Sequence, residues 1–250
     1  MAAHYDSIAE KYKKSKELPF REYIEAYTYF NLMGDLSGKS VLDLACGEGF
    51  YSRRIREKGA ARVVGVDLSP KMIELARKED AIEPRGIEYI ICDVQEMGKI
   101  DSFDLVVASY CLNYAKTQEQ LHKMCQTIVA NLKPGGRFVS INNNLELLPQ
   151  FYSKIEKYGI FQSVLEPLQE GTPITISVTS GVDGEQFTFE NYYLSKSTYE
   201  WAFREVGFQE IHWHQPTVSP EGVQEFGQDY WQDFLNFPDL IGIECFSRLG

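Results

Sequence analysis

The chain has 250 residues, of which 44% are hydrophobic, so it can bury one sizeable core, and α/β proteins of this length often fold as a single domain. Its formal net charge of −11 and pI near 4.9 disfavour nonspecific binding to nucleic acid or to an anionic membrane, because either surface would repel it at long range. We therefore expect a single domain over residues 1–250 that acts on a small molecule.

The N-terminal segment 1–36 is expected to be helical. Aromatic side chains recur at helical spacing at Tyr5 and Tyr12, and again from Phe20 after a break at Pro19. Helices that precede the first strand can only lie across the carboxyl edge or the flank of a sheet, so we expect a helical cover there. Four lysines are expected to form a solvated helix face: Lys11, Lys13, Lys14 and Lys16.

Two short apolar runs come next, and each ends at a carboxylate or a glycine turn. The run 41–44 leads into the turn 46–49, and the run 63–66 leads into Asp67, about 24 residues after Asp43. This layout of strand, glycine turn, helix and second strand is typical of a site for a nucleotide-type cofactor.

The residues of this site narrow the choice of cofactor. Gly47 and Gly49 let the backbone come close to a ligand, and Asp67 can accept hydrogen bonds from both hydroxyls of a ribose. Ser52 stands where a nicotinamide fingerprint has its third glycine, and Asp43 would repel a pyrophosphate. Asp43 would instead attract the ammonium group of an amino acid.

The alternation of strands and helices continues down the chain. Apolar runs also occur at 87–94, at 103–109 and, after a turn, within 132–141, and strands are predicted at 210–215 and 241–246. Helices are predicted at 53–58, 70–78, 117–132 and 198–206. Ser69, followed by Pro70, is a good N-cap for the second of these helices, and we expect Ser197 to cap the last.

Residues 145–194 depart from this alternation. A helical stretch at 149–158 precedes two alternating runs, 174–179 and 186–193, and the turn sequence 181–184 between those runs predicts a β-hairpin. An insertion of about fifty residues is too long for a bare loop. We therefore expect a lid on the cofactor face.

Three residues are candidates for binding a substrate. Tyr110 lies just past the strand 103–109, and Tyr193 lies at the end of the hairpin. Asn142, at the end of the fifth strand, could offer its amide to a polar substrate and could equally close a loop.

Cysteine and histidine spacing gives no sign of a disulfide frame or a metal site. The five cysteines are scattered, and no apolar signal core or run of 18 apolar residues is present, so we expect reduced thiols in a cytoplasmic protein without a membrane segment. His212 and His214 share one strand face, but no third ligand has suitable spacing. We expect no bound metal.

The stretch 41–67 resembles the first motif of the class I S-adenosylmethionine-dependent methyltransferases, and the later strands resemble theirs in order. The resemblance implies a doubly wound, mostly parallel seven-stranded sheet of the Rossmann-like α/β methyltransferase fold, with the last strand antiparallel between strands five and six. It implies S-adenosylmethionine as cofactor, with Asp43 near its methionine end, Asp67 on the ribose and Asp93 on the adenine amino group. Ala45 departs from the glycine often found there. The core residues assigned to the cofactor are Asp43, Ala45, Gly47, Gly49, Asp67, Leu68, Met72, Asp93, Val94 and Ser109.

Beyond the superfamily, the chain resembles the toxoflavin-type (azapteridine) N-methyltransferases of bacterial secondary metabolism. The resemblance lies in the segments 5–12, 16–21, 42–51, 230–234 and 241–245. It implies that Tyr5, Tyr12 and Arg21 cover the cofactor, with Arg21 near its carboxylate. Together with Tyr110 and Tyr193 it favours a planar heteroaromatic acceptor, methylated on a ring nitrogen by in-line transfer that depends on positioning. No catalytic residue is assigned.

Other interpretations stay open at this point. The acceptor could be another small metabolite, methylated on nitrogen or oxygen. A nicotinamide-dependent oxidoreductase and a cofactor-binding protein without turnover are the alternatives from other classes. Methylation of DNA bases is disfavoured because residues 109–112 lack the Asn or Asp followed by two prolines and an aromatic that such enzymes carry.

Overall fold

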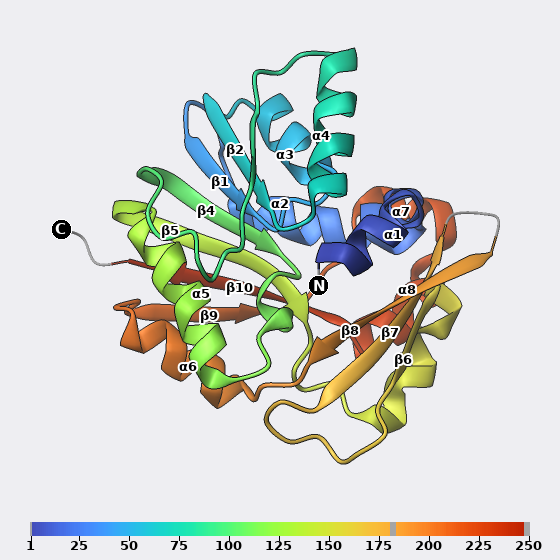
Figure 1. Ribbon diagram of the computed structural model, residues 1–250. Helices are drawn as coiled ribbons and strands as arrows, with labels where there is room; N and C mark the ends of the chain where they lie inside the picture. Colours follow the sequence, from blue (N-terminus) through green and yellow to red (C-terminus); the bar gives the residue numbers. More distant parts are fainter. Residues whose placement is uncertain (1, 181–183, 248–250) are drawn as a thin grey trace.

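The computed structural model describes residues 2–180 and 184–247, and its centre is a seven-stranded sheet (Figure 1). In order across the sheet the strands are β3 (Glu88–Ile91), β2 (Arg62–Asp67), β1 (Ser40–Leu44), β4 (Phe103–Ser109), β5 (Leu132–Asn143), β10 (Leu240–Phe246) and β9 (Glu210–His214). Strands β3, β2, β1, β4 and β5 run parallel, whereas β10 lies antiparallel between β5 and β9. The predicted Rossmann-like fold is confirmed.

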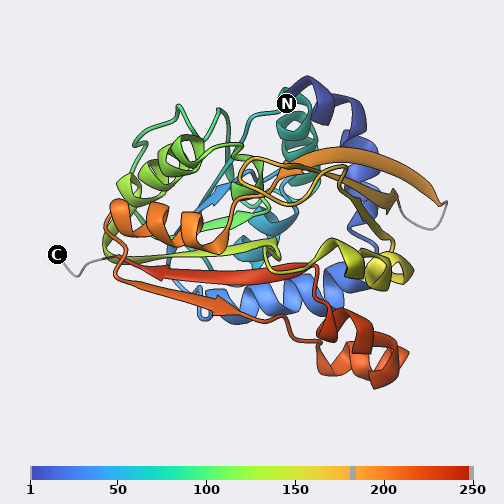
Figure 2. The ribbon, with the colours of Figure 1, turned by 90° about the horizontal axis from the view of Figure 1, so that it is seen from below.

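Helices cover both faces of this sheet (Figure 2). One face is covered by α2 (Tyr27–Met33) and α3 (Phe50–Glu57), the other by α5 (Gln118–Ala130) and α6 (Lys196–Glu205). Successive side chains of a strand point to opposite faces of the sheet. Because helices cover both faces, the strands are apolar on both sides. Val41 packs in the cluster that contains Tyr29, and the next residue, Leu42, packs in the cluster that contains Phe203.

The helix α4 (Pro70–Ile82) lies beside the edge strands. Its Ile73 and Ala76 pack on Tyr89 of β3. Ser69 is its N-cap, as predicted, because the hydroxyl oxygen accepts a hydrogen bond from the backbone N–H of Met72 at 3.1 Å.

The predicted cap at Ser197 is wrong. The helix α6 begins at Lys196, and Ser195 caps it by accepting from the backbone N–H of Thr198 at 3.3 Å. A capping oxygen must reach the amide two or three residues ahead. Ser195 stands at that distance, while Ser197 is already inside the first turn.

A second, three-stranded antiparallel sheet lies outside the main one. It contains β6 (Ile160–Ser163), β7 (Pro173–Ser180) and β8 (Glu185–Tyr192). The predicted hairpin is present, with Ser180 paired to Glu185, but residues 181–183 of its predicted turn lie outside the described residues. The strand β6 was not predicted. Its four residues follow directly on the predicted helical stretch, which is a 3₁₀ helix, η3 (Pro149–Tyr158).

The N-terminal helix α1 (Ala2–Ser15) packs against this second sheet. Ile8 and Tyr12 contact a buried cluster formed by Ile176, Val178 and Phe187. A six-residue π-helix, η1 (Arg21–Ala26), then leads directly into α2. Residues 2–33 are thus mainly helical, as the aromatic spacing predicts.

Two short helices near the C-terminus were not predicted, α7 (Pro220–Phe226) and α8 (Gln228–Asn236). They are held by Trp231, which is fully buried, stacks on Tyr158 with ring centroids 5.8 Å apart and donates its indole N–H to the carbonyl of Gly222 at 2.8 Å. Trp231 therefore packs α8 against η3. Within the described part of the chain, no helix has the length and apolar character needed to cross a bilayer.

Candidate active site

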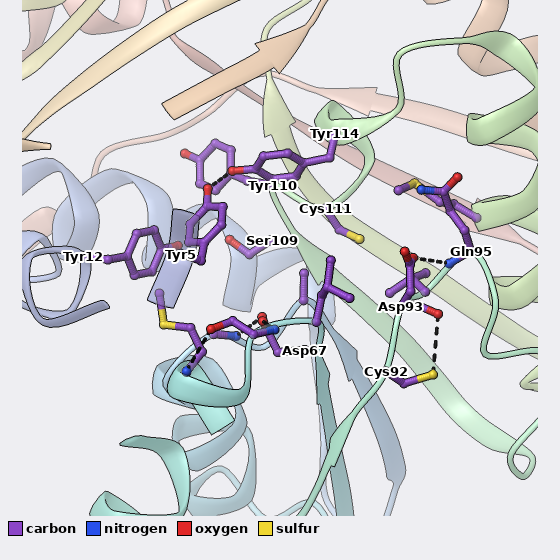
Figure 3. Close-up of a pocket in the computed structure, with 17 residues that line it drawn as sticks. Tyr5, Tyr12, Asp67, Cys92, Asp93, Gln95, Ser109, Tyr110, Cys111 and Tyr114 are labelled. Atoms are coloured by element: carbon purple, nitrogen blue, oxygen red, sulfur yellow. Dashed lines mark hydrogen bonds between the residues drawn. The ribbon is translucent and has the colours of Figure 1, made fainter. Parts of the chain in front are cut away.

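A cavity, here named the main cavity, opens at the carboxyl ends of β1, β2 and β4 (Figure 3). The strand order reverses between β1 and β4, and open α/β sheets bind ligands at such a switch point. Ten of the thirteen predicted cofactor residues line it: Tyr5, Tyr12, Ala45, Gly47, Asp67, Leu68, Met72, Asp93, Val94 and Ser109. Ser69, Cys92, Gln95, Tyr110, Cys111, Tyr114 and Met124 complete the lining.

Asp67 stands at the end of β2 with both carboxylate oxygens facing backbone amides. Oδ2 accepts from the N–H of Gly47 at 2.8 Å, and Oδ1 accepts from the N–H of Ser69 at 2.8 Å. Burial raises the pKa of Asp67, and these backbone hydrogen bonds oppose the rise. A carboxylate offers about four lone-pair positions, so the side chain is fixed in place and still has capacity for a diol in the cavity.

The glycine turn has two differently placed glycines. Gly47 lines the main cavity, and a Cβ added there would lie 3.7 Å from the ring of Tyr12. Gly49 caps α3 at φ 81° and is packed by the hydroxyl of Tyr89, 2.5 Å from where its Cβ would be. Gly49 therefore serves the turn and helix packing and does not line the cavity. Ala45 adopts a left-handed φ of 53°, which a glycine at this position would adopt without strain.

Asp93 follows β3 on the far side of the cavity from the tyrosines (Figure 3). Its Oδ1 accepts from the N–H of Gln95 at 2.9 Å, which holds the carboxylate toward the cavity. Ser109, at the end of β4, has a buried hydroxyl oxygen without a hydrogen-bond partner within the described residues. The two carboxylates that line the main cavity therefore lie apart, Asp67 at the end of β2 and Asp93 after β3.

A small hollow adjoins the main cavity and shares Tyr12, Ala45 and Ser109 with it. It holds Asp43 and Lys16, which have opposite charges. Asp43 is 1% exposed and accepts from the hydroxyl of Ser52 at 2.6 Å. Burial raises the pKa of Asp43 to about 7, against the hydrogen bond from Ser52.

Lys16 does not belong to a solvated face. Its side chain is 7% exposed, its Nζ lies 3.5 Å from Oε1 of Glu25, and it stands 5.0 Å from the centroid of the Tyr51 ring. The reason is that α1 ends at Ser15, so Lys16 lies in the turn beyond the helix. Helical spacing predicts which residues share a face only within the helix. The nearby Pro19 indicates that the helix ends before it.

Glu25 is the centre of a buried polar network. It is fully buried, pairs with the guanidinium of Arg21 and accepts from the hydroxyls of Tyr51 at 2.6 Å and Tyr110 at 2.8 Å. Burial alone would raise its pKa, but Arg21 and Lys16 together with the two tyrosines hold the pKa of Glu25 at about 2. Glu25 is therefore ionised at neutral pH, and no local sequence pattern singles it out.

A second cavity, here named the side cavity, shares Tyr5, Tyr12, Tyr110 and Tyr114 with the main cavity. Its other walls come from the N-terminal segment, the end of β5, the second sheet and the residue before β10: Phe20, Arg21, Asn143, Ile160, Ile176, Val178, Phe189 and Asp239. Arg21 thus lines this cavity and not the main one. The hydroxyls of Tyr5 and Tyr114 are hydrogen-bonded to each other at the boundary of the two spaces (Figure 3).

Two of the three predicted substrate residues lie elsewhere. Asn142 is fully buried and donates its amide to the hydroxyl of Tyr199 at 3.1 Å, so it serves packing between β5 and α6. Tyr193 lines a separate small hollow with Tyr152 and Gln162. The third predicted substrate residue, Tyr110, lines both the main cavity and the side cavity. Side chains alternate along β5, so the residue that reaches the side cavity is the next one, Asn143.

The five thiols are all free. Over residues 2–180 and 184–247, no three His, Cys, Asp or Glu side chains gather closely enough to hold a metal ion. His212 and His214 have ring centroids 6.3 Å apart on β9, and His214 lies 3.4 Å from Glu244.

Comparison with known proteins shows which family part of this chain resembles. Residues 41–136 match the family model described as methyltransferase domain. This segment is similar to that family. It covers β1 to the start of β5 and so includes the floor of the main cavity.

Relatives of known description share part of the chain. A demethylmenaquinone methyltransferase of Lactococcus lactis is 31% identical over 169 residues, which are 64% of this chain and 64% of the relative. A ubiquinone biosynthesis O-methyltransferase of Coxiella burnetii is 32% identical over 114 residues, 44% of this chain and 47% of the relative. The chain thus spans less than two thirds of the length of the curated relatives it matches.

Solved structures share the fold over nearly the whole chain. An S-adenosylmethionine-dependent methyltransferase from Mesorhizobium loti superposes with a TM-score of 0.64 at 19% identity, covering 93% of this chain and 99% of the other. A complex of DhpI with S-adenosylhomocysteine superposes with a TM-score of 0.62 at 16% identity, covering 99% and 95%. At these identities the likeness supports the fold alone.

Proposed function

We propose that this protein is an S-adenosylmethionine-dependent methyltransferase that acts on a small planar heteroaromatic molecule at a ring nitrogen. The observation that carries the proposal is the junction of two cavities. One lies at the switch point of a methyltransferase domain and is lined by Asp67 and Asp93. The other is walled by aromatic and aliphatic side chains and meets the first at four tyrosines.

The side chains of the main cavity fit the parts of S-adenosylmethionine. Asp67 has free lone pairs for the ribose hydroxyls, and Asp93 can accept from the adenine amino group. In the adjoining hollow, Asp43 suits the ammonium group of the methionine part and Lys16 suits its carboxylate. In this proposal Lys16 takes the role that the family resemblance implied for Arg21, because Arg21 lines the side cavity instead.

Catalysis in this proposal depends on positioning. When bound, S-adenosylmethionine supplies a methyl group activated by its sulfonium charge. The tyrosines at the cavity junction limit the approach of the acceptor to one direction and exclude water, and such alignment can supply most of the rate of an in-line displacement. A neutral ring nitrogen presents its own lone pair, so no strong base is required.

The position of the lid and cover supports the same proposal. The helix α1 supplies Tyr5 and Tyr12 to both cavities, and the hairpin β7–β8 supplies Ile176, Val178 and Phe189 to the side cavity. We infer that residues 1–36 and 145–194 form the cover and the lid of one catalytic domain.

Radiolabelled methyl transfer tests the proposal. The panel contains azapteridines, pteridines, purines, catechols, small amines and carboxylic acids, and we expect label to enter the azapteridines or pteridines fastest. The relatives named for demethylmenaquinone and for ubiquinone biosynthesis make a ring-hydroxylated acceptor the principal competitor. Preferred turnover of a catechol would refute the ring-nitrogen acceptor, and the absence of S-adenosylhomocysteine binding in calorimetry would refute the cofactor.

A further inference from the structure

The side cavity contains an arginine whose hydrogen-bonding capacity is only partly used. Arg21 is 4% exposed, and its Nη1 is paired with Glu25. Its Nε is buried without a partner, and Nη2 makes no hydrogen bond within the described part of the chain. A buried donor left unpaired is unfavourable, so a ligand that pairs with it gains affinity. The guanidinium lies against two flat rings, 4.8 Å from the centroid of Phe20 and 5.5 Å from that of Tyr110.

The same cavity contains a buried carboxyl group from a different element. Asp239, just before β10, is 5% exposed. Its Oδ1 accepts from the side-chain amide of Gln162, and Oδ2 has no hydrogen-bond partner among the residues described. The backbone carbonyl of Asp239 accepts from the N–H of Asn144 at 2.6 Å. The residue is therefore anchored from two sides while one carboxylate oxygen stays available.

We propose that Arg21 and Asp239 together read one edge of the methyl acceptor, an edge that carries an N–H donor beside a carbonyl oxygen or ring nitrogen. Arg21 donates to the oxygen or nitrogen, and Asp239 accepts from the N–H. This inference rests on the proposed function, because it assigns the side cavity to the acceptor of that reaction.

The charges of the surroundings favour this donor–acceptor edge over a simple anion. The carboxylate of Glu25 already pairs with the guanidinium of Arg21, so among the residues described the side cavity has no unpaired cation for an anionic ligand. An ionised Asp239 would repel an anion, whereas it can accept from the N–H of a neutral heterocycle. Flat apolar walls from Phe20, Ile176 and Val178 suit a planar ring.

Protonation of Asp239 should then control binding. Burial raises its pKa to about 7; Arg21 opposes the rise and Glu25 adds to it. The other groups that interact with it are the amide of Gln162 and the hydroxyls of Tyr110 and Tyr152. Because only the carboxylate can accept the N–H in addition to the bond from Gln162, affinity for a neutral N–H heterocycle should fall as the pH drops through 7.

The test compares two ligands on the full-length protein saturated with S-adenosylhomocysteine. Lumazine, a pteridine dione, carries the N–H and carbonyl edge, and 1,3-dimethyllumazine has the same ring system with both N–H groups methylated. We expect lumazine to bind at least tenfold more tightly at pH 8, by calorimetry, and to lose that preference at pH 5.5. Equal affinity of the two ligands at pH 8 would overturn the inference without any variant.

Variants then locate the effect. Asp239→Asn should remove the preference for lumazine and its pH dependence, while Asp233→Asn, an exposed position on α8 paired with Lys157, should leave both unchanged. Binding of S-adenosylhomocysteine should stay the same in both variants. If Asp239→Asn still binds S-adenosylhomocysteine and still prefers lumazine, this inference alone is refuted. If the wild-type protein does not bind S-adenosylhomocysteine, the proposed function is refuted.

Discussion

The hydroxyl of Tyr110 donates to Oε2 of Glu25 at 2.8 Å, and this bond joins the end of β4 to the π-helix η1. Tyr110 has a left-handed φ of 56°, a conformation that costs a non-glycine residue of order 1–3 kcal/mol and persists only where surrounding contacts hold it. The bond to Glu25 is such a contact. It couples Tyr110, which lies at the boundary between the two cavities, to the buried ion pair of Glu25.

Tyr110→Phe should therefore destabilise the protein by about 1–3 kcal/mol, because it leaves the buried carboxylate of Glu25 with one hydrogen bond fewer. Urea denaturation measures the change as a lower midpoint with an unchanged slope. Tyr23→Phe is the control, since its hydroxyl donates to Glu225 at the exposed surface and its loss should change stability by less than about 0.5 kcal/mol. Equal effects of the two substitutions would mean that the network around Glu25 is not strengthened by burial.

Asp67→Ala should weaken binding of S-adenosylmethionine about ten- to a hundredfold, because charged hydrogen bonds of roughly 1.5–3 kcal/mol are lost. Titration calorimetry measures the affinity. Asp67 also fixes the amides of Gly47 and Ser69, so Asp67→Asn is the second variant, which retains one acceptor oxygen. Asp101→Ala, exposed at the surface, is the control. Unchanged affinity in both Asp67 variants would remove the ribose role from this residue.

Lys16→Met tests the charge in the hollow beside the main cavity. We expect it to weaken S-adenosylhomocysteine, which has an amino acid carboxylate, and to leave 5′-methylthioadenosine, which has none, unaffected. Lys11→Met, at the exposed ion pair with Glu185, should change neither. A parallel loss of affinity for both ligands would show that Lys16 acts by packing, and an unchanged affinity for both would move the carboxylate back toward Arg21.

The sheet was predictable because each of its strands carries its own signal. Every apolar run such as 103–109 corresponds to an observed strand, and Asp67 and Asp93 follow from their places at strand ends. The turn around Gly49 and Ala45 could be predicted from its glycines. Which of its residues line the cavity could not: Ala45 does and Gly49 does not.

The side cavity could not be predicted from the sequence because it forms between distant segments. Arg21, Asp239 and Ile176 come from three parts of the chain, and no local period relates them. Glu25 and Lys16 are charged residues that local pattern assigns to the surface, and only tertiary pairing makes their burial tolerable. Sequence position could not show which hollow Tyr193 faces for a similar reason: the residue follows the hairpin strand β8 but lines a hollow other than the main and side cavities.

Asp43→Asn should change how stability depends on pH. The folded protein holds the proton of Asp43 up to a pKa of about 7, while an unfolded aspartate loses it near 3.9. Between these values the folded state binds more protons, so the stability that wild type draws from this group falls as the pH rises from about 4 to about 7. The variant carries no such charge, and its stability relative to wild type should increase by about 1.4 kcal/mol per pH unit from pH 5 to pH 7 and level off above pH 7, a total of roughly 2.6 kcal/mol.

Thermal unfolding at a series of pH values measures this difference. Asp104→Asn is the matched control: the backbone and side chain of Ser40 and the ammonium of Lys133 outweigh burial and hold the pKa of Asp104 at about 2, so its offset from wild type should be flat between pH 5 and pH 8. A flat offset for Asp43→Asn as well would mean that Asp43 is ionised throughout this range, held so by Lys16.

The cover and the lid should close together when the main cavity is filled. The helix α1 contributes Tyr5 and Tyr12 to that cavity, and Tyr12 also packs on Phe187 of the hairpin with ring centroids 5.9 Å apart. A ligand that fixes Tyr12 therefore reduces the motion of both segments. Hydrogen exchange with S-adenosylhomocysteine should slow in 5–30 and in 173–192 by a larger factor than in α8, which lines neither cavity. Protection confined to the residues around Gly47 and Asp67 would show that the second sheet is a fixed wall and that acceptors enter without its movement.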